Sequence, residues 1–275
     1  MSYVLDAGKN KHNMDELSKI HLDHQTISFK DLVGTGKKQI TFDCVDIEQA
    51  KDYAAEDADV TYRLYKKFLK DIKEERLVNI YESFEKPMIE ILAKMEISGI
   101  KLNKDFLSKL SKKFEKKITQ LEQEIFKISK KKFNIGSTKQ LGEIMYNDLK
   151  ISTLKKTKKG SFATSASVLE DLAFKGNQLP KLVLEWRQIS KLRNTYSDSL
   201  PEYINPTSKR VHTSFLLAAT TTGRLASSDP NLQNIPIKSE DGKEIRKAFI
   251  SEKGCSLLSA DYNQIEMRIL SDLAD

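Results

Sequence analysis

The sequence predicts a mainly α-helical protein with an α+β part toward its C-terminal end. Two observations support this fold class. Apolar residues recur at helical spacing in several long segments before about residue 205. Beyond Arg210, short alternating and apolar runs typical of strands precede one last helical pattern. Hydrophobic residues make up 39% of the chain and charged residues 31%, which is typical of a globular protein and not of a disordered one.

The first long helix is predicted from Asp46 to Ile72. Asp46 suits the N-cap position, and Gln49 follows three residues later as in a capping box. We expect the apolar stripe of this helix to consist of Ile47, Ala50, Ala54, Ala58, Thr61, Tyr65 and Phe68. A second helix is predicted over Phe84–Ser98. It ends at Gly99, because glycine readily adopts the left-handed conformation that often follows a helix.

The longest helical pattern begins after Asn103, the expected N-cap, and runs to about Lys130. Its apolar stripe consists of Phe106, Leu107, Leu110, Phe114, Ile118, Leu121, Ile125 and Ile128. The opposite face carries lysine and glutamate. This pattern favours a long antiparallel arm with one solvated face over a fully buried core helix.

Shorter elements follow this arm. Capping boxes at 137–140 and at Ser167 with Glu170 predict two helix starts. Residues 155–165 lack periodicity and predict a loop. A further helix is predicted over Leu182–Leu200, with Trp186, Ile189, Leu192 and Tyr196 on one side.

The C-terminal part changes to strand patterns. Val211, Thr213 and Phe215 alternate with polar residues, and the run Cys255–Ala260 predicts a short buried strand. Helical spacing returns over 264–274. A strand that leads into a helix at the end of the chain gives the expectation of an unfinished α/β domain, and therefore of a fragment of a longer protein.

Positive charge is concentrated in one region. The net charge is +7, and residues 101–175 hold 18 lysines against 8 acidic residues. Clustered lysines suit a polyanion such as nucleic acid, because they displace the counterions condensed on its phosphates. A solvated lysine-rich surface explains the same composition, so charge alone leaves both interpretations open.

The chain lacks the marks of a membrane or secreted protein. It has no run of eighteen apolar residues, and its first twenty residues lack the apolar core of a signal peptide. Cys44 and Cys255 lie far apart in the sequence among apolar residues. We therefore expect reduced, buried cysteines, a cytoplasmic location and no membrane partner.

One irregular segment stands out at Thr220–Lys238, which reads TTTGRLASSDPNLQNIPIK. Its glycine, prolines and asparagines predict turns. Arg224 and the amides of Asn231, Gln233 and Asn234 suit the acceptors of a DNA minor groove. An ordinary surface loop accounts for the same residues.

A candidate carboxylate follows the predicted strand at Asp261. A carboxylate at the end of a strand can bind Mg²⁺, which prefers a few carboxylates together with phosphate oxygens. Alternatively, Asp261 caps the following helix. Glu266 lies in the first turn of that helix, where a negative charge is favourable in any case.

These segments together resemble bacterial family A DNA polymerases. SADYNQIEMRIL resembles motif A of their palm domain, and TGRLASSDPNLQNIPI resembles the loop that precedes motif A in the palm. YAAEDADVT at Tyr53–Thr61 is similar to the third motif of their 3′–5′ exonuclease domain. STKQL at Ser137–Leu141 and LEWRQISKLRNTY at Leu184–Tyr196 resemble their thumb. The resemblance runs through the whole chain in the family's order.

The resemblance implies a truncated multidomain polymerase in three parts. Residues 1–75 correspond to the end of the exonuclease domain, 76–205 to a helical thumb, and 206–275 to the start of the palm. The implied activity is template-directed addition of deoxynucleotides to a primer 3′ end in DNA replication and repair. The implied partners are primer–template duplex and deoxynucleoside triphosphates, with a monomer associated with the bacterial nucleoid.

The resemblance also assigns roles in the palm. Asp261 is the implied catalytic carboxylate and a ligand of two Mg²⁺ ions, with the Tyr262 carbonyl as a further ligand. Tyr262, Gln264 and Glu266 are the implied nucleotide-binding residues, and Glu266 selects deoxyribose. The implied DNA-binding residues are Arg224, Asn231, Gln233, Asn234, Lys238, Arg268, Arg187, Lys191 and Arg193, with the lysines of 155–159. Lys238 stands where many relatives carry arginine, so a bidentate phosphate contact is in doubt there.

In the exonuclease-like part, Tyr53 and Asp57 lie four residues apart on one helix face. The resemblance implies that they orient an attacking water and that Asp57 holds a metal ion. Elsewhere the family pattern is incomplete, because none of the four histidines precedes an Asp-Glu pair. We therefore expect this chain alone to bind DNA without catalysing synthesis. The alternatives are a non-catalytic DNA-binding module, the remnant of a 3′–5′ exonuclease, and a single-subunit RNA polymerase, against which Glu266 and the loop at 220–238 argue.

Overall fold

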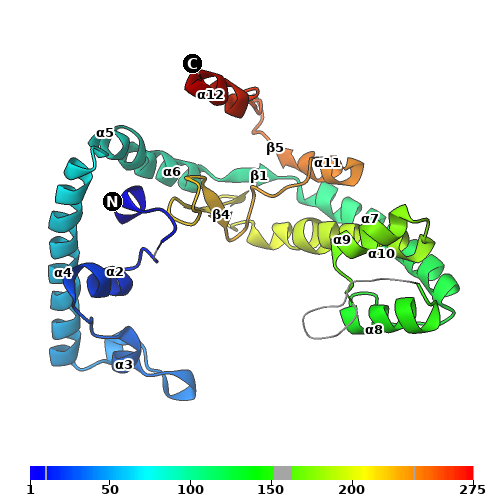
Figure 1. The fold of residues 1–275 in the computed structure, drawn as a ribbon, viewed down its shortest axis with the longest axis horizontal. Coiled ribbons are helices and arrows are strands. Elements are labelled where there is room, and N and C mark those ends of the chain that lie inside the picture. The colour runs from blue at the N-terminus through cyan, green and yellow to red at the C-terminus, as the bar shows by residue number, and fades with distance from the viewer. Residues whose placement is uncertain (10, 152–162, 238, 275) are drawn as a thin grey trace. The chain divides into compact units, whose positions relative to one another are not determined.

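The computed structural model describes residues 1–9, 11–151, 163–237 and 239–274. It divides the chain into two compact units (Figure 1). Unit 1 comprises Met1–Ser98 and Thr213–Gln233, and unit 2 comprises Gly99–His212 and Asn234–Asp275. This division follows contacts within the chain. The three-part division at residues 75 and 205 stays a prediction.

Unit 1 is helical apart from one hairpin. Its helices are α1 (Ser2–Leu5), α2 (Met14–Leu22), α3 (Phe29–Val33), α4 (Ile47–Glu74), α5 (Val78–Ile80) and α6 (Lys86–Ser98), with a π-helical turn at Tyr81–Glu85. The hairpin consists of β3 (Ser214–Leu216) paired antiparallel with β4 (Ala226–Ser228). Phe215 lies opposite Ser227 in this pairing. The alternation of Val211, Thr213 and Phe215 predicted one strand. That prediction is wrong, because Val211 belongs to β2 (Arg210–Val211) and Phe215 to β3.

Helix α4 begins where its sequence predicts. The Asp46 side chain accepts hydrogen bonds from the backbone amides of Glu48 and Gln49, at 3.0 and 3.4 Å. The buried face of the helix differs from the predicted stripe. It consists of Val60, Leu64, Phe68 and Ile72. The predicted members Ile47, Thr61 and Tyr65 are exposed, because α1 and α2 pack against a face of α4 centred one residue away.

Unit 2 combines a helical part with a small sheet. Its helices are α7 (Lys104–Ser129), α8 (Thr138–Gly142), α9 (Ala166–Phe174), α10 (Gln178–Leu192), α11 (Glu240–Arg246) and α12 (Ile265–Ala274). The sheet has the order β2 (Arg210–Val211), β1 (Ile100–Leu102) and β5 (Phe249–Ile250), all antiparallel. Gly99 precedes β1 with φ +57°, as predicted for the residue that ends α6. A side chain there would clash with the Val211 carbonyl at 2.6 Å.

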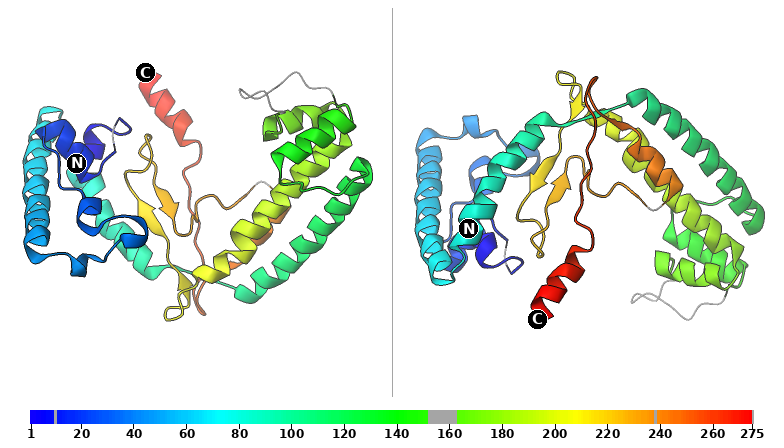
Figure 2. Two further views of the ribbon diagram at one scale, coloured as in Figure 1. Left: turned by 90° about the horizontal axis from the view of Figure 1, so that it is seen from below. Right: turned by 90° about the horizontal axis from the view of Figure 1, so that it is seen from above.

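Helices α7 and α10 form an antiparallel pair, and they lie side by side in every view of Figures 1 and 2. Three contacts give the direction: Arg193 with Glu115, Lys117 with Glu185, and Trp186 with Glu122. The Asn103 side chain caps α7 by accepting from the Phe106 amide at 3.0 Å. The predicted antiparallel arm is therefore confirmed.

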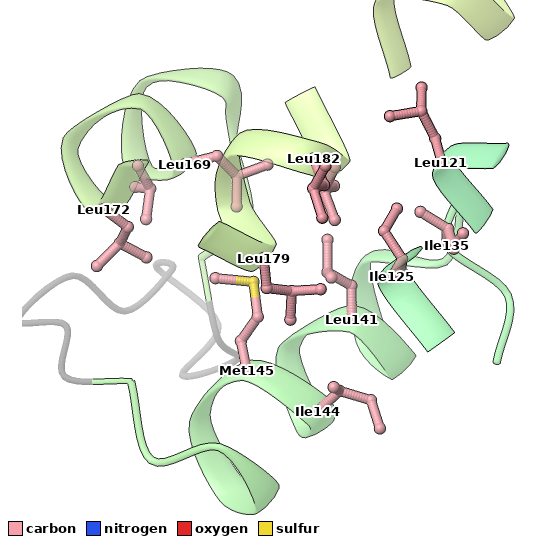
Figure 3. Close-up of a cluster of buried hydrophobic side chains, with 12 residues drawn as sticks. Leu121, Ile125, Ile135, Leu141, Ile144, Met145, Leu169, Leu172, Leu179 and Leu182 are labelled. Atoms are coloured by element: carbon pink, nitrogen blue, oxygen red, sulfur yellow. The ribbon is translucent and has the colours of Figure 1, made fainter. Parts of the chain in front are cut away.

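The core of unit 2 lies at one end of this pair (Figure 3). Leu121 and Ile125 of α7 meet Leu179 and Leu182 of α10, and Leu141 of α8 lies between them. The other members of this cluster are Ile135, Ile144, Met145, Val168, Leu169, Leu172 and Val183. Trp186 packs partly buried against the same cluster, so it reports on the packing of this unit.

Helix starts in this region agree with the sequence only in part. The Ser137 hydroxyl accepts from the Gln140 amide at 3.4 Å, as a capping box requires. Ser167 was predicted to begin a helix, which is wrong. α9 begins at Ala166 after Ser165, and the two serine hydroxyls lie 3.2 Å apart. Most of the loop predicted at 155–165 lies outside the described residues.

Helix α10 starts four residues before the predicted Leu182. Pro180 lies in the first turn of this helix, where the backbone needs no amide donor from it. After Leu192 the chain continues through a π-helical turn at Arg193–Asp198 and a 3-10 turn at Leu200–Tyr203. The apolar side predicted for this segment is confirmed for Ile189, Leu192 and Tyr196, which are buried.

The strand predicted at Cys255–Ala260 is absent. These residues run without regular secondary structure and are exposed. A strand needs a neighbour to pair its backbone groups, and among the described residues no segment pairs with this one. The helix after it is confirmed as α12, but all its residues are exposed.

The cysteines also differ from expectation. Cys44 and Cys255 are free, as predicted, but both are exposed instead of buried. Their apolar sequence neighbours misled the prediction, because Phe42 and Leu257 beside them are themselves exposed. None of the helices in the described ranges combines the length and the apolar composition needed to span a membrane.

Candidate nucleic-acid interface and carboxylate sites

The predicted catalytic segment lies on the surface of unit 2. Asp261 and Tyr262 are exposed in the irregular stretch between β5 and α12. Gln264 adopts φ +52° immediately before α12, and its carbonyl accepts from the amides of Met267 and Arg268. The alternative that Asp261 caps α12 is therefore wrong, because the helix starts four residues later at Ile265.

Among the described residues, the hydrogen bonds of this segment's side chains are local. Arg268 donates from Nε to the Asn263 carbonyl at 3.1 Å, which turns its guanidinium back toward the start of the helix. Glu266 lies exposed in the first turn of α12. Its charge is favourable there because unpaired amides give the helix N-terminus a partial positive charge.

A metal ion needs more ligands than this segment offers. In the part of the chain that the structure describes, histidine, cysteine, aspartate and glutamate do not gather in groups of three that could hold a metal. Two divalent ions about 3.5–4 Å apart need more than one carboxylate to offset their repulsion. Asp261 by itself does not fit a two-metal centre.

Buried hydroxyl groups of unit 1 order the part of the loop at 220–237 that runs from Ser227 to Leu232. The Thr213 hydroxyl lies 2.6 Å from that of Ser227 and donates to the Pro230 carbonyl at 2.8 Å. Ser227 accepts from the Leu232 amide at 3.1 Å. Since both hydroxyls are buried, these bonds fix the backbone course from Ser227 to Leu232.

The side chains predicted to contact DNA lie outside this buried network. Arg224, Asn231 and Gln233 are exposed on unit 1. Asn231 also bends its own loop, since its side chain accepts from the Gln233 amide at 3.0 Å. In unit 2, the exposed Asn234 offers its carbonyl to the Tyr196 hydroxyl at 2.5 Å. Lys238 lies outside the described residues.

The basic residues predicted on the thumb-like helices differ in availability. Arg187 donates to the Thr164 carbonyl at 2.7 Å, and burial lowers its pKa. Arg193 pairs with Glu115 at 3.0 Å and with Asp198 at 3.2 Å. Lys191 is exposed. Two of the three predicted phosphate ligands thus make contacts inside the protein, and the lysines of 155–159 lie outside the described residues.

Helix α7 carries several exposed positive charges. Its side away from the core carries exposed lysines along a helix of 26 residues, about 39 Å in length. These exposed lysines are Lys104, Lys109, Lys112, Lys113, Lys116 and Lys127. Flexible ammonium groups spread along one helix suit a phosphate backbone without reading bases.

Tyr53 and Asp57, the residues predicted for the exonuclease-like part, are partly buried in unit 1. Burial raises the pKa of the Tyr53 hydroxyl, and the charge and hydrogen bond of Asp57 add to this. The ring of Tyr53 lies about 6 Å from those of Phe29 and Phe42. Oδ1 of Asp57 is buried and accepts no hydrogen bond from any described residue. A buried carboxylate oxygen of this kind suits a cation, although one carboxylate alone does not complete a site.

The sequence prediction missed Glu56, the neighbour of Asp57. Its carboxylate accepts from the Ile27 amide at 2.6 Å and contacts His24 Nε2 at 2.7 Å. The Ile27 amide, and to a lesser degree His24, hold the pKa of Glu56 below its usual value. The helix pattern placed Glu56 on the same turn as Asp57, but only the fold brings His24 and Ile27 to it.

Comparisons with known proteins agree with this picture. A family model described as DNA polymerase family A matches residues 104–275, and a 3′–5′ exonuclease model matches residues 1–73. DNA polymerase I of Rhizobium leguminosarum is 50% identical over 275 residues, which is 100% of this chain and 27% of the relative. DNA polymerase I of Pseudomonas aeruginosa is 45% identical over 99% of this chain and 30% of the relative.

A solved structure is also similar. The polymerase domain of Pol1 from M. smegmatis, in complex with DNA primer–template and dNTP, matches with a TM-score of 0.82 at 29% identity. The match covers 99% of this chain and 44% of that one. The chain spans less than a third of the length of the DNA polymerases I of Rhizobium leguminosarum and Pseudomonas aeruginosa.

Proposed function

The chain belongs to DNA polymerase family A, and on that premise we propose that it is part of a DNA-directed DNA polymerase. The proposed activity is addition of deoxynucleotides to a primer 3′ end in DNA replication and repair. The observation that carries this proposal is the match of the family model over 104–275, which includes both the loop at 220–238 and the segment of Asp261.

The proposed partners follow from the solved relative, whose structure contains primer–template DNA and a nucleotide. In this chain the exposed lysines of α7 contact duplex phosphates, and Arg224 with Asn231, Gln233 and Asn234 contacts the minor groove near the primer terminus. Lys238, Lys191, Arg187, Arg193 and Arg268 complete the proposed DNA-binding set. Arg187 and Arg193 must exchange their internal contacts for phosphate, so we expect them to contribute least.

The nucleotide side of the site is assigned to the segment before and within α12. Asp261 is the catalytic carboxylate, with Tyr262 and Gln264 beside the nucleotide. Glu266 closes the 2′ side of the sugar and so selects deoxyribose. We place this polymerase with its DNA in the bacterial cytoplasm, as a monomer. Its parts are an exonuclease-like segment (1–75), a thumb (76–205) and the start of a palm (206–275).

Family A polymerases use divalent metal ions. For Mg²⁺, the proposed ligands in this chain are Asp261 and the Tyr262 carbonyl, with Asp57 in the exonuclease-like part. At neither place do histidine, cysteine, aspartate and glutamate of the described residues gather in groups of three, which does not fit a two-metal centre. We therefore expect the 275-residue chain by itself to bind DNA but neither to extend nor to degrade it.

The experiment that tests the activity is a chimera. These 275 residues replace the matching segment of the Rhizobium leguminosarum DNA polymerase I, and primer extension is measured with four deoxynucleotides and Mg²⁺. We expect extension by the chimera and its loss on Asp261→Ala. The matched control is Asp272→Ala, an exposed aspartate of α12 that leaves extension intact. Equal activity of both variants would refute the role of Asp261.

The isolated chain serves as the complementary sample. Extension by the purified 275 residues, abolished by Asp261→Ala, would overturn the expectation of inactivity. If the chain binds duplex DNA while the chimera fails to extend primers, the alternative of a non-catalytic DNA-binding module gains support.

Sugar selection is tested in the same chimera. Glu266→Ala removes the group that excludes a 2′-hydroxyl, so we expect more incorporation of ribonucleotide relative to deoxyribonucleotide. Single-nucleotide extension with each triphosphate measures this ratio. Glu266→Gln keeps the shape without the charge and separates steric exclusion from electrostatics. An unchanged ratio in the alanine variant would remove Glu266 from this role.

A further inference from the structure

A tyrosine at the start of unit 1 bridges the turn that precedes Arg224. The Tyr3 hydroxyl donates to the Thr220 carbonyl at 2.7 Å and accepts from the Gly223 amide at 3.1 Å. Thr220 and Gly223 are the first and last residues of one four-residue turn. A single side-chain hydroxyl from more than 200 residues away thus connects both ends of this turn.

The surroundings of Tyr3 hold its ring in place. The His12 ring contacts it edge-on, with ring centres 5.4 Å apart, and His12 Nδ1 lies 2.6 Å from the Ser2 hydroxyl. Gly8 packs against the same turn. A Cβ atom at Gly8 would lie 2.4 Å from the Thr221 methyl group. Residues 2–9 and 11–12 therefore form a close-fitting support under the turn.

The turn determines the backbone at Arg224. The Thr220 hydroxyl donates to the Arg224 carbonyl at 2.8 Å. Gly223 has φ +76°, which glycine adopts without strain. On the other side of Arg224, β4 begins at Ala226 and is anchored through the buried Ser227. Arg224 is thus an exposed side chain on a short segment that is fixed at both ends.

We propose that Tyr3 is a positioning residue for Arg224: its hydroxyl holds the Thr220–Gly223 turn in the shape that presents the Arg224 guanidinium to the primer terminus. This inference rests on the proposed function for the role of Arg224. It assigns a task in synthesis to a residue of the exonuclease-like segment, which the polymerase motifs do not include. Tyr3 acts through the turn.

The size of the effect follows from hydrogen-bond energetics. Loss of one or two neutral hydrogen bonds shifts a local equilibrium by about threefold to tenfold. Tyr3→Phe keeps the ring, its packing and its contact with His12, and removes only the bridge. The turn then samples other shapes, and the fraction of molecules with Arg224 correctly placed falls.

The first test uses the 275-residue chain and does not depend on activity. Amide hydrogen exchange at Gly223 is compared between the wild type and Tyr3→Phe. We expect exchange at Gly223 to become about threefold to tenfold faster, while amides of the α7–α10 core remain unchanged. Tyr62→Phe is the matched control, because Tyr62 is exposed and its ring contact with Lys66 does not need the hydroxyl. Equal exchange rates of the Gly223 amide in Tyr3→Phe and in the wild type would contradict the proposal that the Tyr3 hydroxyl holds the turn.

The second test is a double-mutant cycle in the polymerase chimera. We expect Tyr3→Phe to lower the rate of single-nucleotide addition about threefold to tenfold, with the KM for the incoming nucleotide unchanged. If Tyr3 acts only through Arg224, the double variant Tyr3→Phe/Arg224→Ala has the rate of Arg224→Ala alone.

The outcomes separate the two proposals. A wild-type chimera that does not extend primers contradicts the proposed function and leaves the exchange experiment to decide on the bridge. An active chimera that loses rate on Arg224→Ala but not on Tyr3→Phe contradicts the positioning role alone. Rate losses that multiply in the double variant also contradict it, because independent losses mean that Tyr3 acts elsewhere.

Discussion

Helices α7 and α12 carry the same kind of amphipathic pattern, yet only α7 buries it. The apolar side of α7 is buried at Leu107, Leu110, Phe114, Leu121 and Ile125. On α12 the apolar residues Ile265, Met267, Ile269, Leu270 and Leu273 are all exposed, between 39% and 78%. Periodicity indicates which face of a helix needs a partner, whereas the tertiary contacts decide whether the face has one.

The lengths of the two helices sharpen the contrast. A helix of 10 residues without packed neighbours is marginal in water, since an isolated helix needs about 12–15 residues even with favourable composition. α7 has 26 residues and packs on α10, on the π-helical turn at Arg193–Asp198 and on α11. The stability of unit 2 therefore comes from the α7–α10 pair and its core.

The largest effect is expected from the same substitution made in both helices. Leu107→Ala in α7 should lower the free energy of unfolding by about 2–5 kcal/mol, because it opens a cavity at a fully buried position. Leu273→Ala in α12 should change it by less than about 0.5 kcal/mol. Urea unfolding followed by the fluorescence of Trp186, the single tryptophan, measures both. Similar losses would mean that α12 is packed in solution.

A second prediction concerns the outer face of α7. We expect the chain to bind duplex DNA weakly, with an affinity that falls as salt rises. Replacing Lys109, Lys112 and Lys116 with glutamine should reduce the slope of log K against log salt by up to about 2.7, at about 0.9 per lost phosphate contact. The control replaces Lys51, Lys66 and Lys70 of α4, which removes the same charge. An equal reduction by the control would show that net charge, and not the α7 face, binds DNA.

The smallest effect on the free energy of unfolding is expected at Lys117, which forms ion pairs between α7 and the neighbouring helices α10 and α11. Lys117 lies 3.0 Å from Asp241 of α11 and 3.2 Å from Glu185 of α10. Burial disfavours its charge, but the hydrogen bonds and charges of the two carboxylates outweigh burial and raise its pKa. Lys117→Met should cost about 0.5–1 kcal/mol at neutral pH, since the group is partly exposed.

The pH dependence of this contribution has a definite sign. A raised folded-state pKa means that the stabilisation is complete below the ordinary lysine value of 10.5 and is lost as pH rises through the folded-state value. The difference in unfolding free energy between wild type and Lys117→Met should therefore shrink above about pH 10.5. Lys116 is an exposed neighbour of Lys117. Lys116→Met should therefore leave the free energy of unfolding unchanged both at neutral pH and above about pH 10.5.

Local chemistry made much of this protein predictable from its sequence. The caps at Asp46, Asn103 and Ser137 formed as expected, because the hydrogen bond that an amide donates to a side-chain oxygen two or three residues before it depends on nothing distant. Gly99 ended its helix for the same reason. The candidate residues Arg224, Asp261 and Glu266 came from motifs, and their roles stay predictions.

The tertiary structure alone decided which faces and groups are used. α4 buries Val60 and Leu64 and not the predicted Ala54 and Ala58, because the position of α1 and α2 sets the buried side. Arg193 pairs with Glu115, more than seventy residues away, and Tyr3 reaches a turn more than two hundred residues away. Caps and turns follow from the conformations open to a few neighbouring residues, whereas burial, ion pairs and strand pairing require a second segment at a distance that sequence spacing does not encode.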